Sequence, residues 1–281
     1  MTLALQAAQT ALWSDFGLRA VVAAELEWYV WPRLTDNQHP SAPLPVDLPL
    51  DMVEEWIRVA SSAIGVMPES IERERGTGQW ECSLPMQRDA MTLANQLTQL
   101  RVALQETFSA HGYVACFDAK PFANTYGSAM HIHIHLEDAA GENVYWKDSE
   151  QLSGPLSHSL GGLLATTRAS LDVFAPTAAA RTRFVAGWHA PVNASWGGNN
   201  RTVALRLPDG TGKLSGHANL LRAIPSRERR IEHRVAGADA DPFCVIEAIL
   251  NGIHYGLRHR VAPPAAIHGD AADSRYHLPH F

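Results

Sequence analysis

The most regular feature of the chain is an alternation of apolar and charged side chains with the two-residue period of a β-strand. In the segment AELEWYVW, Leu26 and Trp28 alternate with Glu25 and Glu27. The same alternation recurs in residues 78–84, 130–136 and 229–235. Because successive side chains of a strand point to opposite faces, each segment predicts a strand with one apolar and one charged face.

The charged faces of these predicted strands carry unusual chemistry. The segment MHIHIHL places three histidines on one face, and RRIEHRV places Arg230, Glu232 and Arg234 on one face. An ordinary half-buried strand carries a more mixed set of polar residues there. If these faces share one concave sheet, they enclose a cavity. It would offer carboxylates for hard divalent cations and arginine forks for phosphate.

Each motif taken singly has another interpretation. Two acids on one strand are typical of a solvated face, and the segment RRIEHR suits an exposed strand with cross-strand ion pairs. Three imidazoles on one strand also suit zinc, which favours nitrogen ligands. A zinc hydrolase built on His131, His133 and His135 therefore stays open as an interpretation.

Helical patterns lie between the strand-like segments. Leu93, Leu97 and Leu104 fall on one stripe ahead of Gly112, and Asp241 precedes a proline in the order typical of a helix start. We predict helices at residues 51–64, 89–110, 157–174 and 241–258. The proline-rich segment 36–51 predicts an exposed loop. Strands and helices alternate without a strict βαβ rhythm, which favours an α+β fold.

The composition narrows the class of protein. The 281 residues carry 23 basic and 29 acidic side chains, a formal net charge of -6, and 46% are hydrophobic. The hydrophobic fraction is enough for a packed core, and the excess of acidic residues disfavours a protein that binds nucleic acid or an anionic membrane. No apolar run reaches the ~18 residues of a membrane span, and the N-terminus lacks a secretory pattern. Three scattered cysteines indicate the reducing cytoplasm.

Several segments together resemble the catalytic domain of the glutamine synthetase superfamily, the ATP-dependent γ-glutamyl-amine ligases. They are AELEWYVW, ERGTGQWE, KPFANTYGSAMHIHIHL, RFVAGWHAPVNASWGGNNRTVALRLP and RRIEHRVAGADADPF, and they occur in family order. The resemblance implies an α+β domain at residues 20–260, in which a curved antiparallel β-sheet forms a funnel with flanking helices. Residues 1–19 would be an N-terminal extension and residues 261–281 a C-terminal tail, either loose or docked.

The resemblance also implies ATP and two or three Mg²⁺ or Mn²⁺ ions as cofactors. One ion would be held by Glu27, Glu74 and Glu81, and another by Glu25, His131 and Glu232. Glu72 is a second candidate for the position given to Glu74, because the family spacing varies there.

The substrate residues follow from the same motifs. The acid substrate would contact Gly127, Tyr126, Arg183 and Arg234. The transferred phosphoryl group would contact Arg201, and the nucleotide would contact His133, Arg206 and Arg230. Arg183, Arg201 and His189 form the implied catalytic set. Arg201 and Arg206 fall on opposite faces of an ideal strand, so a bulge would be needed if both act.

The sequence departs from the family pattern at three places. His189 stands where the family has a flap glutamate that helps bind and deprotonate ammonium. Tyr126 and Ala129 replace an asparagine and a glycine, which indicates either an acid substrate other than plain glutamate or a neutral variation. Only 24 residues precede Glu25, too few for the β-grasp domain by which family members lend a loop to a neighbouring subunit.

The resemblance and its departures favour an ATP-dependent ligase that joins glutamate or an analogue to an amine other than ammonia, through an acyl phosphate. The alternative is an incomplete or non-catalytic homologue that binds nucleotide or amino acid, or needs a partner subunit. The expected partners are small molecules and further copies of the chain in a homo-oligomer. A partner protein replacing the N-terminal domain is a further possibility, and neither nucleic acid nor membrane is expected.

Overall fold

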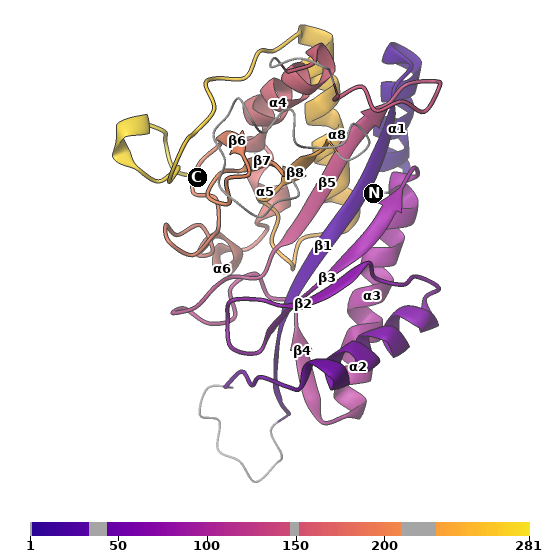
Figure 1. Cartoon of the computed structure of the whole chain (residues 1–281), viewed down its shortest axis with the longest axis vertical. Coiled ribbons are helices and arrows are strands. Elements are labelled where there is room, and N and C mark those ends of the chain that lie inside the picture. Colours follow the sequence, from indigo (N-terminus) through magenta and orange to yellow (C-terminus); the bar gives the residue numbers. More distant parts are fainter. Residues whose placement is uncertain (1, 34–43, 147–151, 209–228) are drawn as a thin grey trace.

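The computed structural model describes residues 2–33, 44–146, 152–208 and 229–281, and its elements form an α+β fold (Figure 1). The strands are β1 (Arg19–Pro32), β2 (Ser70–Arg73), β3 (Gln79–Gln87), β4 (Tyr113–Cys116), β5 (Met130–Glu137), β6 (Trp196–Gly198), β7 (Leu205–Leu207) and β8 (Ile231–His233). The helices are α1 (Thr2–Phe16), α2 (Leu50–Ala63), α3 (Ala90–Ala110), α4 (Gly154–Thr167), α5 (Leu171–Phe174), α6 (Ala178–Arg181) and α8 (Pro242–His259), with a short 3₁₀ turn at Ser274–Tyr276. The strands make one sheet in the order β2-β3-β1-β5-β8-β7-β6, and β4 pairs with the end of β1.

Three of the four predicted helices form within a residue or two of their predicted bounds. Asp241 caps α8 by accepting a hydrogen bond from the backbone N–H of Cys244 at 3.1 Å. The predicted helix at 157–174 is instead two helices, α4 and α5. In the last turn of α4, the Thr166 and Thr167 hydroxyls donate to carbonyls of the preceding turn, a pairing that weakens helix propagation.

Helix α1 was not predicted, although Leu5, Ala8 and Leu12 recur at helical spacing and are buried. The helix belongs to the packed body of the protein. The Gln9 side-chain carbonyl accepts a hydrogen bond from the backbone N–H of Ala90 at 2.7 Å, at the start of α3. Asp15 lies 2.8 Å from the ring of His254 in α8. Of the predicted loop at 36–51, residues 34–43 lie outside the described residues, and α2 begins at Leu50.

All described strand pairs are antiparallel except one, β6 with β7, so the sheet is mixed. The antiparallel sheet expected from the sequence is found, with this one parallel pair at its edge. Because each strand has only three residues, the connection from the end of β6 has to lead back by only ~10 Å before β7 can run parallel to β6. Asn199, with φ 35°, begins that return, and its N–H donates to the carbonyl of Leu207 at 2.8 Å.

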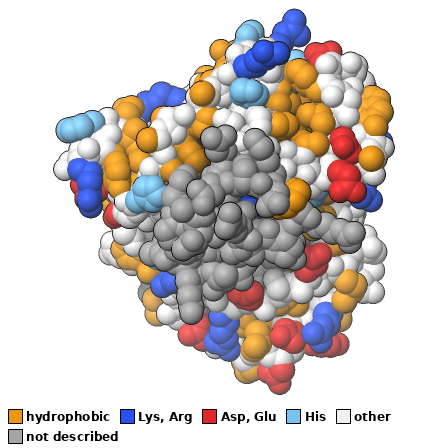
Figure 2. Space-filling view, turned by 45° about the horizontal axis from the view of Figure 1, so that its top comes forward, with side chains coloured by type: hydrophobic (Ala, Val, Ile, Leu, Met, Phe, Trp, Pro, Cys, Tyr) orange, Lys and Arg blue, Asp and Glu red, His pale blue; other side chains and the backbone are white. Residues whose placement is uncertain are grey.

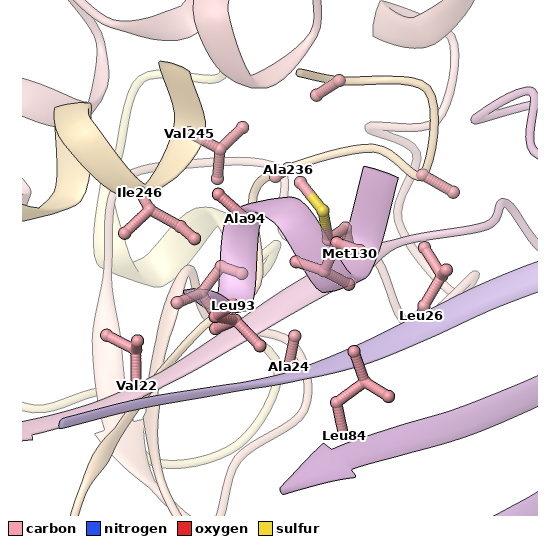
Figure 3. Close-up of a cluster of buried hydrophobic side chains, with 14 of the residues drawn as sticks. Val22, Ala24, Leu26, Leu84, Leu93, Ala94, Met130, Ala236, Val245 and Ile246 are labelled. Carbon is pink, nitrogen blue, oxygen red and sulfur yellow. The ribbon is translucent and has the colours of Figure 1, made fainter. Parts of the chain in front are cut away.

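The apolar faces of the four predicted strands form the main core, as the alternation predicted. In Figure 3, Val22, Ala24 and Leu26 of β1 face Leu93 of α3 and Ile246 of α8. Helices α1 and α3 run along this side of the sheet in Figure 1, and α4 packs on α8. The helices therefore occupy one face of the sheet and leave the charged face available for a site.

Helices α4 and α8 approach closely because glycines face each other where they cross. A Cβ at Gly162 would lie inside van der Waals contact with the carbonyl oxygen of Gly252 and with the backbone of Gly256. The helices can therefore pack at this distance only without a side chain at Gly162.

Replacing Gly162 with alanine is expected to lower the free energy of unfolding by ~1–3 kcal/mol, because the helices must separate to admit the methyl group. Urea unfolding followed by circular dichroism measures the change. Gly154→Ala is the matched control in the same helix, since a Cβ there meets nothing within 4 Å. Equal stability of the two variants would contradict the packing explanation.

Candidate active site

A cavity of about 410 Å³ opens on the charged face of the sheet. It is lined by every site residue that the family resemblance implied: Glu25, Glu27, Glu74, Glu81, Tyr126, Gly127, His131, His133, Arg183, His189, Arg201, Arg206, Arg230, Glu232 and Arg234. These residues come from five strands and from the loops around them. The expectation that separate charged faces meet in one concave sheet is therefore confirmed.

The register of the strands brings the acidic residues together. Glu27 of β1 lies opposite Glu81 of β3, and Glu25 of β1 lies opposite His131 of β5. On the other side of β5, His133 lies opposite Glu232. Directly opposed residues have their Cβ atoms ~5 Å apart, so these side chains are forced into contact. The interpretation of the acids as a solvated outer face is wrong, because Glu27, Glu81 and Glu232 are buried.

Three carboxylates, those of Glu27, Glu74 and Glu81, form the most crowded acidic group, which we call the carboxylate triad. Each offers an oxygen, and these oxygens all lie within 4.8 Å of one another. Burial and then the charge of Glu74 raise the pKa of Glu27 to about 8. Burial and the neighbouring acids Glu25 and Glu27 also raise the pKa of Glu81 well above its usual range. The triad thus repels itself and is suited to a divalent cation.

Glu232 is held in the opposite way. Its carboxylate is paired with Arg234 and lies 2.6 Å from Arg206. Burial alone would raise the pKa of Glu232, but the charges of Arg234 and Arg206 outweigh it and lower the pKa to about 2. Glu232 is therefore ionised and already compensated by protein groups, unlike the triad.

The second predicted metal group, Glu25, His131 and Glu232, is only partly reproduced. Potential ligand atoms of Glu25 gather with those of His133 and Glu232, and separately with those of Glu81 and His131. Nδ1 of His131 lies 3.1 Å from Glu25 and 3.7 Å from Glu232, so the predicted three are neighbours. Among the described residues, each group contains carboxylates, and none joins the three histidines of the zinc interpretation.

Glu74 and Glu72 separate clearly in the structure. Glu74 follows β2 and belongs to the carboxylate triad, whereas Glu72 lines the cavity from within β2 and joins no such group among the described residues. The choice of Glu74 over Glu72 is supported by this placement.

Arginines line the cavity around the acids. Arg183, which is buried, donates to the backbone carbonyl of Val235. A Cβ at Gly127 would collide with the side chain of Arg183, so the glycine makes room for the guanidinium stem. Burial lowers the pKa of Arg183 to about 10, which leaves it charged at neutral pH. Nε of Arg230 donates to Nδ1 of His133 at 3.0 Å.

Arg201 and Arg206 reach the same cavity without a strand bulge between them. Arg206 lies on β7, while Arg201 lies in the turn between β6 and β7. The expectation of opposite strand faces was wrong because residues 199–204 are not a strand.

His189 lies at the rim of the cavity in a turn. Its backbone has φ 57°, an uncommon value for a residue with a side chain, and Nη2 of Arg234 donates to its carbonyl at 3.1 Å. The Tyr126 ring lies edge-on to the rings of Trp188, at 5.2 Å, and His189, at 5.7 Å. Burial and the charges of Arg75, Arg234 and Arg201 lower the pKa of His189, so its imidazole is neutral at pH 7.

Some lining residues were not among the predicted site residues: Ser70, Arg75, Gln79, Ser83, Ala129, Trp188, Ala190 and Pro208. Gln79 orders the site, because its side-chain N–H groups lie 3.3 Å from Glu27 and 3.0 Å from the carbonyl of Gly127. Its position between the glutamates of ERGTGQWE is the sequence feature that could have identified Gln79 as a site residue. For Trp188, the only such feature is that it directly precedes His189 in the sequence.

The face in Figure 2 intersperses acidic and basic side chains around its edge, with no continuous basic area in its described part. In the described part of the chain, every helix is too short or too polar to span a bilayer.

Comparison with known proteins agrees with this geometry. Residues 4–278 match the family model described as glutamine synthetase, catalytic domain. The chain is 31% identical to gamma-glutamylputrescine synthetase PuuA of Escherichia coli (strain K12), over 93% of this chain and 57% of that protein. It is 31% identical to a glutamate–isopropylamine ligase of a Pseudomonas species, over 74% of this chain and 42% of that protein. The chain thus spans about half the length of these relatives.

Solved structures show the same fold. A GmaS/ADP complex superposes with a TM-score of 0.79 at 23% identity, over 99% of this chain and 64% of that one. Plasmodium falciparum glutamine synthetase superposes with a TM-score of 0.79 at 17% identity, over 96% of this chain and 58% of that one. With the family model spanning nearly the whole chain, the protein belongs to the glutamine synthetase catalytic-domain family.

Proposed function

We propose that the chain carries the active site of an ATP-dependent ligase that joins glutamate, or a close analogue, to an amine other than ammonia. The observation that carries the proposal is one cavity in which a self-repelling carboxylate triad, a set of arginines and a neutral His189 lie together. Members of the family use ATP and divalent metal ions. The names of two relatives, gamma-glutamylputrescine synthetase and glutamate–isopropylamine ligase, support an organic amine.

The donor groups fit divalent cations. Glu27, Glu74 and Glu81 would hold one Mg²⁺ or Mn²⁺ ion, since hard cations prefer carboxylate oxygens and burial and mutual repulsion raise the pKa of Glu27 to about 8. Glu25, His131 and Glu232 would hold a second ion, and His133 is placed to share in that site. When bound, such cations neutralise charge on the phosphate oxygens during phosphoryl transfer.

The arginines divide by position into two tasks. Arg183, which lies next to Gly127, and Arg234 would bind the carboxylates of the acid substrate, and Tyr126 would close that side. Arg201, Arg206 and Arg230 line the same cavity with His133 and would meet the nucleotide phosphates. A planar guanidinium pairs with two oxygens at once, so these residues orient the phosphate as well as neutralise it.

His189 would act in the second half of the reaction. The amine nitrogen forms a bond to the carbonyl carbon of the acyl phosphate, and the bond from that carbon to the phosphate oxygen breaks. Phosphate leaves with the electron pair, and the imidazole of His189 takes the extra proton from the nitrogen. A neutral imidazole can accept this proton, whereas it lacks the negative charge that attracts ammonium.

We also propose how the enzyme is assembled and where it acts. Relatives of this family assemble from several copies, and we expect a homo-oligomer acting on small molecules in the cytoplasm. A partner protein that completes the site stays a prediction from the sequence, as do the bounds of the N-terminal extension and the C-terminal tail.

Turnover is expected to depend on the amine that is supplied. The chain with ATP, Mg²⁺ and glutamate is expected to release phosphate faster when an organic amine is added, and ammonia is expected to be a poorer substrate. Arg201→Ala should lower kcat/KM by about 100-fold or more, because it removes a charge placed to stabilise the transferring phosphoryl group.

Arg58→Ala is the matched control, since Arg58 lies on the surface of α2 beside Glu54 and should leave turnover unchanged. Binding of ATP and metal without turnover for any amine would instead support the non-catalytic or partner-dependent alternative.

Metal binding is expected to stabilise the fold. Mn²⁺ at 100 times its Kd is expected to raise the free energy of unfolding by about 2.7 kcal/mol for each site that it fills, and Glu81→Gln should abolish the part that comes from the carboxylate triad. Thermal unfolding with and without Mn²⁺ measures it. Glu72→Gln is the matched control, because Glu72 lies directly opposite Glu81 across the strands but outside the carboxylate triad. Loss of the gain in both variants would argue against the assignment.

A further inference from the structure

Arg201 differs from Arg206, its neighbour in the cavity, in how its side chain is held. Nε of Arg206 donates to Oδ1 of Asn199 at 3.1 Å, and its Nη1 lies 2.6 Å from a carboxylate oxygen of Glu232. Among the described residues, no hydrogen bond or ion pair is found for the Arg201 side chain. Within this part of the chain, the place of the Arg201 guanidinium therefore depends on the turn that carries it, residues 199–204.

Asn200 fastens this turn to a distant part of the chain. Its side chain is buried, and its amide nitrogen donates to the carbonyls of Gly269, at 2.7 Å, and Ile267, at 3.3 Å. Its amide oxygen accepts from the backbone N–H of Thr202, at 3.0 Å, and from the Thr202 hydroxyl, at 2.8 Å. An asparagine side chain has two N–H groups and two oxygen lone pairs, so Asn200 uses its whole hydrogen-bonding capacity here.

Thr202 makes a second connection on the other side of Arg201. Its hydroxyl oxygen accepts a hydrogen bond from the backbone N–H of Ala271 at 2.9 Å. The residues directly before and after Arg201 are thus both bonded to the segment 267–271. Of the two states that the sequence left open for the C-terminal tail, the docked one is found for this part.

The segment 267–271 is itself packed against the protein, so it can support the turn. A Cβ at Gly197 would lie 2.7 Å from the carbonyl oxygen of Ile267, which means that the backbone of β6 approaches this segment closely. Ile267 and Ala271 also form a buried apolar cluster with Val203. The turn is therefore bonded to a segment whose own position is fixed by packing.

We propose that Asn200 is a positioning residue, which docks the turn on residues 267–271 and thereby holds the Arg201 guanidinium against the transferred phosphoryl group. The inference rests on the proposed ligase function and adds to it a residue that does not line the acidic cavity. A guanidinium stabilises the transition state of phosphoryl transfer only when it is already in place, and a misplacement of ~1 Å can cost about 100-fold in rate.

Asn200→Asp tests the proposal with a side chain of nearly the same shape. The carboxylate cannot donate to the carbonyls of Ile267 and Gly269, and it repels them, so the turn loses its anchor. In steady-state kinetics of the full chain, kcat is expected to fall about 10-fold, while KM for ATP and for glutamate changes less than about two-fold. Asn95→Asp is the matched control, because Asn95 is exposed on α3 and its amide donates to the carbonyl of Met91 at 2.9 Å.

Thr202 offers a second pair of variants if Asn200→Asp proves unstable. Thr202→Val keeps the shape of the side chain but loses the hydroxyl that bonds to Asn200 and Ala271, and it should lower kcat about three- to ten-fold. Thr202→Ser keeps the hydroxyl and is expected to restore most of the rate. Thermal unfolding with and without Mn²⁺ shows whether each variant is folded and keeps its carboxylate triad.

A double-mutant cycle with Arg201→Ala separates positioning from a general structural effect. Because Asn200 acts through Arg201, Asn200→Asp should cost less than about two-fold once the Arg201 side chain is already absent. An equal loss of kcat in both backgrounds would overturn the inference and leave the ligase function standing, as would an unchanged kcat in both Asn200→Asp and Thr202→Val. No amine-dependent turnover of the wild-type chain would overturn the ligase function itself, and this inference with it.

Discussion

The structure depends on one electrostatic constraint, the confinement of several carboxylates on one buried sheet face. Glu27, Glu74 and Glu81 place oxygens within 4.8 Å of one another, and burial raises the pKa of Glu27 to about 8. Isolated buried charges are costly, so such a group is stable only when protonated or when a cation neutralises it. Glu232 shows the other solution, since Arg206 and Arg234 already compensate its charge. The carboxylate triad therefore depends on a proton or a cation, whereas Glu232 already has two arginine partners.

The fold holds this arrangement because the opposite face of the same strands is a continuous apolar core. A strand such as β1 packs Leu26 and Trp28 against the helices and thereby has to turn Glu25 and Glu27 into the cavity. A slip of one residue in register would reverse both faces, so the core fixes the geometry of the site. The close crossing of α4 and α8 supports that core from behind.

The core face and the cavity face of the main strands were predictable from the sequence, because a strand with period-2 alternation shows both faces in its pattern. The residues that the sequence left out have weaker signals. Helix α1 has a helical stripe but no cap signal, and the parallel pairing of β6 with β7 depends on a turn at Asn199 that only the folded chain reveals. Asn200 and Thr202 join their turn to residues 267–271, and no local pattern links segments so far apart. Glu25, His131 and Glu232 are neighbours as the sequence predicted, and the structure also brings His133 to Glu25.

The most direct test of the account is to locate Mn²⁺ in crystals of the protein by its anomalous scattering. The account predicts a peak within bonding distance of the carboxylates of Glu27, Glu74 and Glu81, which lies on the cavity side of β1 and β3. A peak held by His131, His133 and His135 alone, or no peak at the carboxylate triad under saturating Mn²⁺, would contradict it.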